Sequence, residues 1–341
     1  MQQAFIELKK RLNKPQNIAI IIHRNPDGDA VGASLALQKF LIKAEHNVAV
    51  ISPNEVPNYL SWLPGTDAVI QYDKHTSKAQ QLLKDADMIF TLDFNDFSRT
   101  GKSLEAFLET LSDKDFVMID HHLEPSNYAT YMFSNSDKSS TSEMVYDFIK
   151  DLGWTFFIDK DMATCLYTGI MTDTGSFKFP NTTSHTMRIV ADLMSRGIDH
   201  NAIQIKIYDS FSLDKLHLLG EALNKLIFLP EYKTAYIALT KEDLQKYHYQ
   251  KGDTEGFVNY GLSLADAHFA VMFLENEEGG VRISFRSKGK VPANEFAKQY
   301  FNGGGHLNAA GGRTTGNLEE AVALFLEKLP SFKDKIIQAN E

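Results

Sequence analysis

Apolar, strand-like runs alternate with segments of helical spacing over the first third of the chain. The apolar runs are residues 17–22, 47–52, 87–94 and 115–122. Residues 28–44 lie between the first two runs and repeat alanine and leucine at the helical period, and a second helical stretch occurs near 102–111. A strand, a helix and a strand form a βαβ unit, which requires a parallel sheet with helices on its faces. Because the runs are apolar nearly throughout, we expect strands that are buried on both faces.

The rest of the chain predicts further helices and then a second, smaller α/β domain. Residues 128–133 are strand-like, and a capping box from Ser140 to Glu143 begins a helix that ends at Gly153. More helices are predicted at 161–173, 184–196 and, in a mostly helical stretch, 200–227. The later predicted elements are strands 233–240, 267–276 and 280–288, a helix 293–301, a glycine-rich loop 302–312 and a helix near 318–329. The expected fold class is therefore α/β, with a parallel-sheet domain over 1–195, a helical connector over 196–228, a smaller α/β domain over 229–341, and a cleft between the domains.

Net charge and cysteine content restrict the function classes. The 341 residues carry a net charge of −9, which argues against coating long nucleic acid, because such binding uses a basic face to release counterions from phosphates. Residues 279–316 are the exception, with six basic residues, one acidic residue and a local net charge of +5, which suits a small anionic ligand. Cys165 is the only cysteine, so neither an intrachain disulfide nor a thiolate zinc cluster is expected. We find no signal peptide and no apolar run near the roughly 18 residues of a membrane span, so we expect a cytoplasmic protein with no membrane partner.

Acidic and histidine side chains follow several of the predicted strands. These residues are His23, Asp27 and Asp29 after the first strand, Asp93 after the third, Asp120, His121 and His122 at the fourth, and Asp173 after an apolar helix. In an open parallel sheet the carboxyl ends of the strands line one edge, where ligands collect. Four of these carboxylates gathered there would repel one another unless cations lay between them, and two divalent ions would cancel their charge. Carboxylates and imidazoles without thiolate favour Mn²⁺, Mg²⁺ or Fe²⁺, and Mn²⁺ is preferred because imidazole is a less natural ligand for Mg²⁺.

Two other interpretations of the first loop compete with a metal site. Asp27 and Gly28 form a common turn pair, and Asp29 could cap the helix that follows. A dinucleotide site is disfavoured, because the loop has only Gly28 and Gly32 and places carboxylates where a pyrophosphate needs backbone N–H groups. Only the joint placement of the acidic clusters at strand ends favours the metal site over a structural role.

Six segments of the chain resemble motifs of a known family. HRNPDGDAVGAS (23–34), LDF (92–94), IDHH (119–122) and MTDTGSF (171–177) resemble the four motifs of the DHH phosphoesterases, which are named for Asp-His-His. SFRSKG (284–289) and FNGGGHLNAAGG (301–312) resemble the DHH-associated domain that follows in many members. The two matches together span nearly the whole chain.

The resemblance implies a role for each matching residue. One metal would be held by His23, Asp27 and Asp93, and the other by Asp29, Asp93, His121 and Asp173. Asp93, Asp120 and His122 would serve catalysis, with Asp120 orienting a histidine as ligand imidazoles usually require, and His122 facing the substrate phosphate. Arg99 lies where members often carry an arginine near the substrate, although a solvent-exposed loop residue fits it equally well.

The glycine-rich loop of the second domain is expected to bind an anion. A glycine there could simply end the preceding helix, but one cap needs only one glycine, and here Gly303, Gly304 and Gly305 precede His306. Successive glycines let backbone N–H groups approach a phosphate, and Arg286 offers a bidentate fork. We expect these residues to bind a substrate phosphate.

The architecture narrows the expected substrate within this family. A RecJ-like exonuclease would carry extra nucleic-acid-binding domains, a membrane cyclic-dinucleotide phosphodiesterase would carry spans, and a manganese pyrophosphatase would lack the GGGH loop. The remaining resemblance is to the compact NrnA-type enzymes, which degrade short RNA oligonucleotides and dephosphorylate 3′-phosphoadenosine 5′-phosphate (pAp). The expected partners are these nucleotides and not long nucleic acid; the sequence leaves monomer and homodimer open. The alternatives are a cyclic or linear dinucleotide phosphodiesterase and, from another class, a non-catalytic nucleotide sensor.

Overall fold

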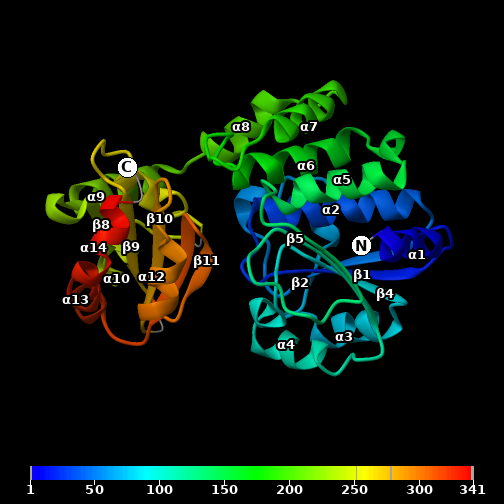
Figure 1. Cartoon of the computed structure of the whole chain (residues 1–341), viewed down its shortest axis with the longest axis horizontal. Helices are drawn as coiled ribbons and strands as arrows, with labels where there is room; N and C mark the ends of the chain where they lie inside the picture. The colour runs from blue at the N-terminus through cyan, green and yellow to red at the C-terminus, as the bar shows by residue number, and fades with distance from the viewer. Residues whose placement is uncertain (1, 251, 277–278, 339–341) are drawn as a thin grey trace. The chain divides into compact units, whose positions relative to one another are not determined.

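The chain divides into two compact units, residues 1–210 and residues 211–341. The computed structural model describes residues 2–250, 252–276 and 279–338. Each unit is built around its own six-stranded sheet (Figure 1). No helix in these described ranges is long and apolar enough to cross a membrane.

The sheet of the first unit is parallel throughout. Its strands are β1 (Asn17–Ile22), β2 (Asn47–Ser52), β3 (Ile70–Gln71), β4 (Met88–Leu92), β5 (Asp115–Asp120) and β6 (Tyr131–Ser134). Their order is β3-β2-β1-β4-β5-β6, and each neighbouring pair runs in parallel. β1 and β4 are buried almost completely, because helices cover both faces of the sheet. The four apolar runs and their parallel arrangement are thus confirmed, while the short edge strand β3 carried no sequence signal that we recognised.

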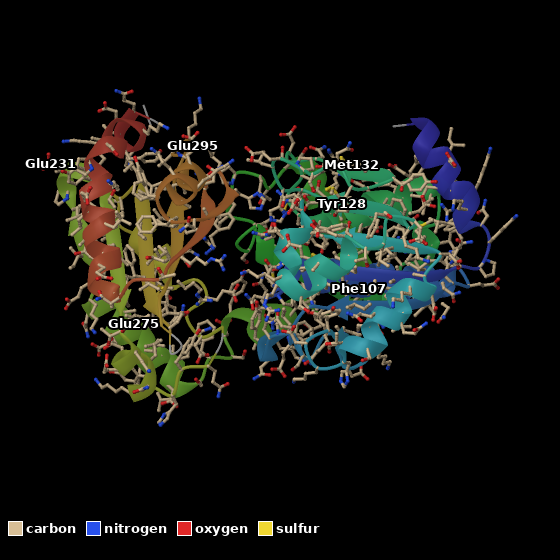
Figure 2. The ribbon with its side chains drawn as sticks, turned by 90° about the horizontal axis from the view of Figure 1, so that it is seen from below. Phe107, Tyr128, Met132, Glu231, Glu275 and Glu295 are labelled. Carbon is tan, nitrogen blue, oxygen red and sulfur yellow. The ribbon has the colours of Figure 1, made fainter. Side chains whose placement is uncertain are left out.

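Helices form a layer on each face of this sheet. They are α1 (Gln2–Leu12), α2 (Gly28–Lys43), α3 (Thr76–Asp85), α4 (Lys102–Leu108), α5 (Thr141–Leu152), α6 (Lys160–Asp173), α7 (Ser184–Ser195) and α8 (His200–Tyr208). α2, α5 and α6 cover one face and α3 and α4 the other (Figure 1). Phe107 of α4 and Tyr128, both labelled in Figure 2, pack against the apolar cluster of the second face.

α2 and α6 approach each other closely because glycines lie at their crossing. A Cβ added to Gly32 of α2 would lie 2.4 Å from the carbonyl oxygen of Cys165 in α6 and 3.1 Å from the backbone nitrogen of Gly169. Both obstacles are backbone atoms, so no side chain could turn away to make room. This close contact fixes the start of α2 against the end of α6, where Asp29 and Asp173 lie.

The N-terminus of α5 differs in part from the predicted capping box. The hydroxyl of Ser140 accepts a hydrogen bond from the backbone N–H of Glu143 (3.0 Å), as expected for the N-cap. The carboxylate of Glu143 does not return to the backbone of Ser140; it accepts hydrogen bonds from the hydroxyls of Ser139 and Thr186 instead. The helix ends at Gly153 in the left-handed conformation, as predicted.

The second unit has a mixed sheet with helices on both faces. Its strands are β7 (Ile227–Leu229), β8 (Thr234–Leu239), β9 (Phe269–Glu275), β10 (Val281–Ser287), β11 (Gly304–His306) and β12 (Ala309–Thr314). Their order is β11-β12-β10-β9-β8-β7, and only β8 and β9 are parallel. The helices are α9 (Leu213–Asn224), α10 (Lys241–Lys246), α11 (Phe257–Leu262), α12 (Ala293–Tyr300), α13 (Leu318–Lys328) and α14 (Lys333–Gln338).

The glycine-rich segment 302–312 is a β-hairpin and not the expected loop. Gly304, Gly305 and His306 of β11 pair with Gly311, Ala310 and Ala309 of β12. Two of the glycines serve this close pairing, because a Cβ on Gly303 would lie 2.0 Å from the carbonyl oxygen of Gly311 and one on Gly305 would lie 2.5 Å from that of Ala309. Gly304 has open space on its Cβ side. The glycines therefore have a structural reason that the sequence interpretation did not include.

Candidate metal centre

A first group of possible metal ligands consists of His23, Asp27 and Asp93. One ligand atom from each lies within 4.8 Å of the others. His23 follows β1, Asp27 is the N-cap of α2, and Asp93 follows β4 in a left-handed conformation (φ 65°) that non-glycine residues rarely adopt. His23 Nε2 lies 3.4 Å from Asp93 Oδ2 and 3.9 Å from Asp27 Oδ1. The capping role that competed with the metal site belongs to Asp27 and not to Asp29, since Asp27 Oδ1 accepts the N–H groups of Asp29 and Ala30.

A second group consists of Asp29, His121 and Asp173. His121 follows β5, Asp29 lies in the first turn of α2, and Asp173 is the last residue of α6. His121 Nε2 lies 3.4 Å from Asp173 Oδ2 and 3.9 Å from Asp29 Oδ2. The ligand atoms of these three residues also lie within 4.8 Å of one another.

Asp93 faces both groups with different oxygens. Its Oδ2 lies 3.4 Å from His23 Nε2, and its Oδ1 lies 3.5 Å from His121 Nε2. Two ligand atoms on one ion, each about 2.1 Å from it at angles of 90° to 109°, are separated by roughly 3.0 to 3.4 Å. Most of the nitrogen–oxygen distances are therefore long for a direct hydrogen bond but close to the spacing of two ligands on one cation.

The two histidines present Nε2 to the carboxylates because Nδ1 is engaged elsewhere. Nδ1 of His23 lies 2.9 Å from the backbone carbonyl of Arg24, and Nδ1 of His121 lies 3.3 Å from that of Lys138. A carbonyl can only accept, so in each neutral ring the proton is on Nδ1 and the lone pair is on Nε2. Histidines that bind metals are usually held in this way.

The charges at this centre are unbalanced without cations. Burial, together with the charges of Asp93 and Asp173, raises the pKa of Asp29 well above its ordinary value. Burial lowers the pKa of His121, but the neighbouring carboxylates outweigh it and raise the pKa to about 9. The donor set thus fits divalent cations, which would balance the carboxylates and leave the imidazoles neutral.

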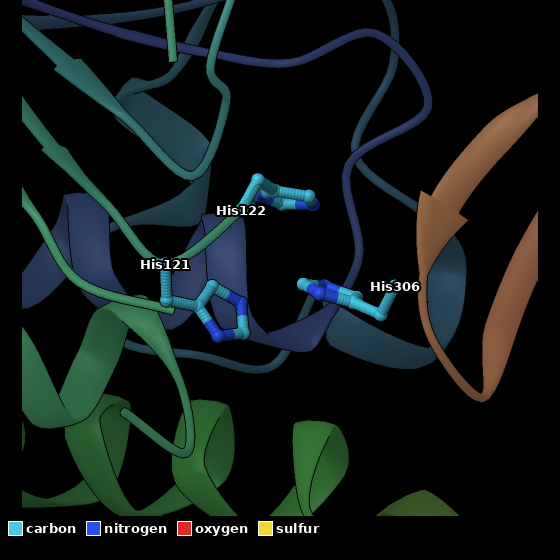
Figure 3. A group of neighbouring side chains, drawn as sticks. All are labelled: His121, His122 and His306. Carbon is cyan, nitrogen blue, oxygen red and sulfur yellow. The ribbon is translucent and has the colours of Figure 1, made fainter. Parts of the chain in front are cut away.

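Asp120 orients His122, which belongs to neither ligand group. Asp120 is fully buried; its Oδ1 lies 2.7 Å from Nδ1 of His122, and its Oδ2 accepts the backbone N–H of His122 (3.1 Å). Asp120 thus orients a histidine as expected, but that histidine is His122, while Nδ1 of the proposed ligand His121 lies near the backbone carbonyl of Lys138. Figure 3 shows His121 and His122 at the end of β5 with their rings turned apart, at an interplanar angle of 70°.

Arg99 lies near the first ligand group. Its backbone carbonyl accepts the N–H of Arg24 (2.8 Å), which ties the loop after β4 to the loop after β1. The side chain itself is exposed. Burial lowers the pKa of His23, but the carboxylates of Asp93 and Asp27 outweigh it and raise the pKa to about 9, and the guanidinium charge of Arg99 has a smaller, lowering effect.

In the second unit, Arg286 and His306 lie in one row across three strands. Arg286 of β10 pairs with Ala309 of β12, and Ala309 also pairs with His306 of β11. Directly paired residues share a face of the sheet, so the two side chains lie on the same face about 10 Å apart, with a methyl group between them. Figure 3 also labels His306, at the edge strand β11. Arg282 and Arg313 form a second directly opposed pair on that face, and no sequence pattern indicates this pairing.

A run of buried polar residues at the start of α5 was not recognised as part of this centre. Ser139, Ser140, Thr141 and Ser142 are all fully buried. From the sequence, this segment was expected only to cap a helix, and its run of four small polar residues is the one local signal of a further role.

Comparison with known proteins identifies the family. Residues 17–170 match the model of the DHH family, N-terminal domain, and residues 232–338 match that of the DHHA1 domain. The chain is 30% identical to the bifunctional oligoribonuclease and PAP phosphatase NrnA of Thermus thermophilus, over 94% of this chain and 91% of the relative. It is also 30% identical to the protein of the same description in Bacillus subtilis, over 86% of this chain and 88% of the relative.

A solved structure agrees with these matches. The crystal structure of an exopolyphosphatase-related protein from Bacteroides fragilis superimposes with a TM-score of 0.93 at 39% identity, over 98% of both chains. The parallel sheet, the ligand groups at its carboxyl edge and both family matches lead to one conclusion: the chain belongs to the DHH family and carries a DHHA1 domain.

Proposed function

We propose that this protein is a metal-dependent phosphoesterase that degrades short oligoribonucleotides to mononucleotides and removes the 3′-phosphate of pAp to give AMP. The observation that carries the proposal is the placement of Asp93, whose two carboxylate oxygens face His23 and His121 separately. The relatives described as oligoribonuclease and PAP phosphatase support the choice of substrates. Their names cover both activities, so one site would serve both.

The proposed centre holds two divalent cations, with Mn²⁺ preferred. One cation would be held by His23, Asp27 and Asp93, and the other by Asp29, Asp93, His121 and Asp173. When bound, such a pair supplies a hydroxide nucleophile near neutral pH and balances charge on the phosphoryl oxygens. The mixture of carboxylate and imidazole ligands is the reason for preferring Mn²⁺ to Mg²⁺.

The protein's own side chains would orient the substrate and move a proton. Asp120 orients the ring of His122 through Nδ1, and we assign to this ring the contact with a phosphoryl or leaving oxygen. Arg286 and His306 lie on one face of the second sheet, and we assign to them the binding of a substrate phosphate. Arg99 is assigned to substrate binding because its backbone carbonyl accepts the N–H of Arg24, the residue next to the proposed ligand His23.

One assay tests the proposal directly. Purified protein with Mn²⁺ would be incubated in parallel with pAp, di- to pentanucleotides, cyclic dinucleotides and pyrophosphate, and the products would be separated by chromatography. We expect AMP and phosphate from pAp and mononucleotides from the oligonucleotides, with all activity lost on chelation and restored by Mn²⁺. Turnover of cyclic dinucleotides alone would favour the dinucleotide phosphodiesterase, and no turnover of any substrate would favour a sensor.

A variant locates the activity at the proposed centre. Asp93→Asn removes the charge that both groups share while keeping the shape of the side chain, so we expect an inactive but folded protein. Full turnover by folded Asp93→Asn would mean that the catalytic metals lie elsewhere.

A further inference from the structure

The first turn of α5 and Lys138 just before it contact proposed metal ligands from three other parts of the fold. The backbone N–H of Thr141 donates to Asp29 Oδ2 (2.6 Å), and that of Ser142 donates to Asp29 Oδ1 (2.8 Å). The hydroxyl of Thr141 donates to Asp93 Oδ1 (2.9 Å). Just before the turn, the carbonyl of Lys138 lies 3.3 Å from Nδ1 of His121. One short segment therefore touches a ligand in α2, one after β4 and one after β5.

These hydrogen bonds fix the orientation of two carboxylates, and both carboxylates can still bind a cation. Each carboxylate oxygen has two lone pairs, so an oxygen that accepts one hydrogen bond can still bind a metal. Both carboxylate oxygens of Asp29 accept hydrogen bonds from adjacent backbone N–H groups at the N-terminus of α5, where a negative charge is favoured. Asp93 accepts the hydrogen bond from Thr141 at Oδ1, and its Oδ2 faces His23.

The buried carboxylate of Glu143 anchors the start of this turn. Glu143 Oε2 accepts hydrogen bonds from the hydroxyls of Ser139 (2.5 Å) and Thr186 (2.7 Å). The ammonium group of Lys138 lies 3.3 Å from the other oxygen of Glu143 and 2.6 Å from Asp147. The backbone of Lys138, whose carbonyl holds His121, is thereby anchored through its side chain as well.

This contact requires a glycine at position 169 in α6. A Cβ added to Gly169 would lie 1.9 Å from the hydroxyl of Ser142 and 2.9 Å from Asp29 Oδ1. Ser142 and Asp29 therefore meet directly against the α6 backbone at Gly169, where a side chain would collide with both.

We propose that the first turn of α5 positions the metal ligands, and that the hydroxyl of Thr141 sets the orientation of Asp93. Thr141 is a positioning residue, since it touches ligands and not the reacting atoms. The proposal rests on the proposed function in that cations bind at Asp93. Without the hydroxyl, the carboxylate shared by both groups can rotate, and residues with this kind of role typically change metal affinity or activity by about 10- to 100-fold.

Three substitutions at Thr141 separate the hydroxyl from the shape of the side chain. Thr141→Val keeps the shape and removes the donor, Thr141→Ala removes the donor without risk of overpacking, and Thr141→Ser restores the donor. Thr168→Val is the matched control, because Thr168 is also fully buried and its hydroxyl donates to the carbonyl of Thr164 in its own helix (2.8 Å).

The primary measurement is calorimetric titration of chelator-treated protein with Mn²⁺ alone. We expect the apparent affinity for Mn²⁺ to fall about 10- to 100-fold in Thr141→Val and Thr141→Ala and to stay within about threefold of the parent in Thr141→Ser and Thr168→Val. With saturating Mn²⁺, kcat should fall in the two variants without the hydroxyl while the KM for pAp is unchanged, because Thr141 does not contact substrate. Circular dichroism of the metal-free proteins would confirm that each variant is folded.

The outcomes distinguish this inference from the proposed function. Parent-like Mn²⁺ affinity and kcat in folded Thr141→Val or Thr141→Ala would overturn the positioning role, as would a loss in Thr141→Ser equal to that in Thr141→Val. Asp93→Asn is titrated alongside. If the parent protein binds no Mn²⁺, or if Asp93→Asn binds it as the parent does, the proposed metal centre fails instead.

Discussion

Replacing Gly32 by alanine tests whether the crossing of α2 and α6 sets the geometry of the metal centre. The added Cβ would lie 2.4 Å from the carbonyl oxygen of Cys165, and real Cβ contacts essentially never fall under 3.0 Å, so the helices must separate by about 0.6 Å or more. Overpacking of this kind costs about 1–3 kcal/mol, and the better helix propensity of alanine offsets about 1 kcal/mol. We expect a net loss of up to about 2 kcal/mol in the free energy of unfolding.

The same displacement should reduce activity, because it moves ligands relative to one another. Asp29 lies in the first turn of α2 and Asp173 at the end of α6, so a change in the spacing of the helices changes the distance between these carboxylates. Misplacement of catalytic groups by about 1 Å can cost on the order of 100-fold in rate. We therefore expect kcat/KM for pAp to fall about 10- to 100-fold at saturating Mn²⁺.

Stability and activity would be measured against a matched glycine. Trp62 and Trp154 are the only tryptophans and both lie in the first unit, so their fluorescence during urea unfolding follows that unit. Gly220→Ala in α9 is the control, because an added Cβ there meets nothing within 4 Å. That substitution should stabilise the protein by about 0.5–1 kcal/mol, as judged by circular dichroism, and leave turnover unchanged. If Gly32→Ala were as stable and as active as the parent, the crossing would not control the centre.

The remaining predictions concern the second unit, the substrate and pH. Arg286→Ala and His306→Ala should raise the KM for pAp more than they lower kcat, and the Mn²⁺ content should be unchanged. Arg282→Ala, on the same strand as Arg286, serves as the control. Loss of bound metal in either variant would contradict this division of roles. Steady-state assays should give the highest kcat/KM for substrates of about two to five nucleotides with only a shallow salt dependence, because the basic segment can neutralise few phosphates, and equal cleavage of a roughly 24-residue RNA would refute this. Burial lowers the pKa of His46, whose Nδ1 accepts the N–H of Gln16, so the folded state resists protonation and stability should fall as the pH drops below about 6.5. His46→Asn keeps an acceptor without the titration, and its Tm should therefore fall less than that of the parent between about pH 7.5 and 5.5; equal falls would exclude His46 as the cause.

The sequence predicted the parallel sheet well because its signals are local. Apolar runs of strand length that alternate with segments of helical spacing predict a parallel sheet from the local sequence alone. The polar residues that follow those runs then meet at one edge by topology alone, and the structure does bring His23, Asp93 and His121 within reach of one another.

The errors arose where structure depends on contacts distant in sequence. The hairpin at 302–312 lacks the β-branched and aromatic residues of typical strands, and it forms because its backbone pairs closely with itself and with β10. Asp120 and His122 bond locally, but nothing in the sequence shows that His121 is held by the carbonyl of Lys138. The contact between Thr141 and Asp29 joins residues more than 100 positions apart and left no local pattern to recognise.

The spread of the ligands along the chain links metal supply to folding. Asp29, His121 and Asp173 lie far apart in the sequence of the first unit, so the second ligand group is complete only after residue 173 has been synthesised and α6 has packed. A cation that binds only this folded state stabilises it by about 2.7 kcal/mol when its free concentration is a hundred times Kd. Cells short of the metal would then hold a protein that is inactive and also more often unfolded, so proteolysis would lower its abundance. Metal availability would in this way control the amount of enzyme as well as its turnover.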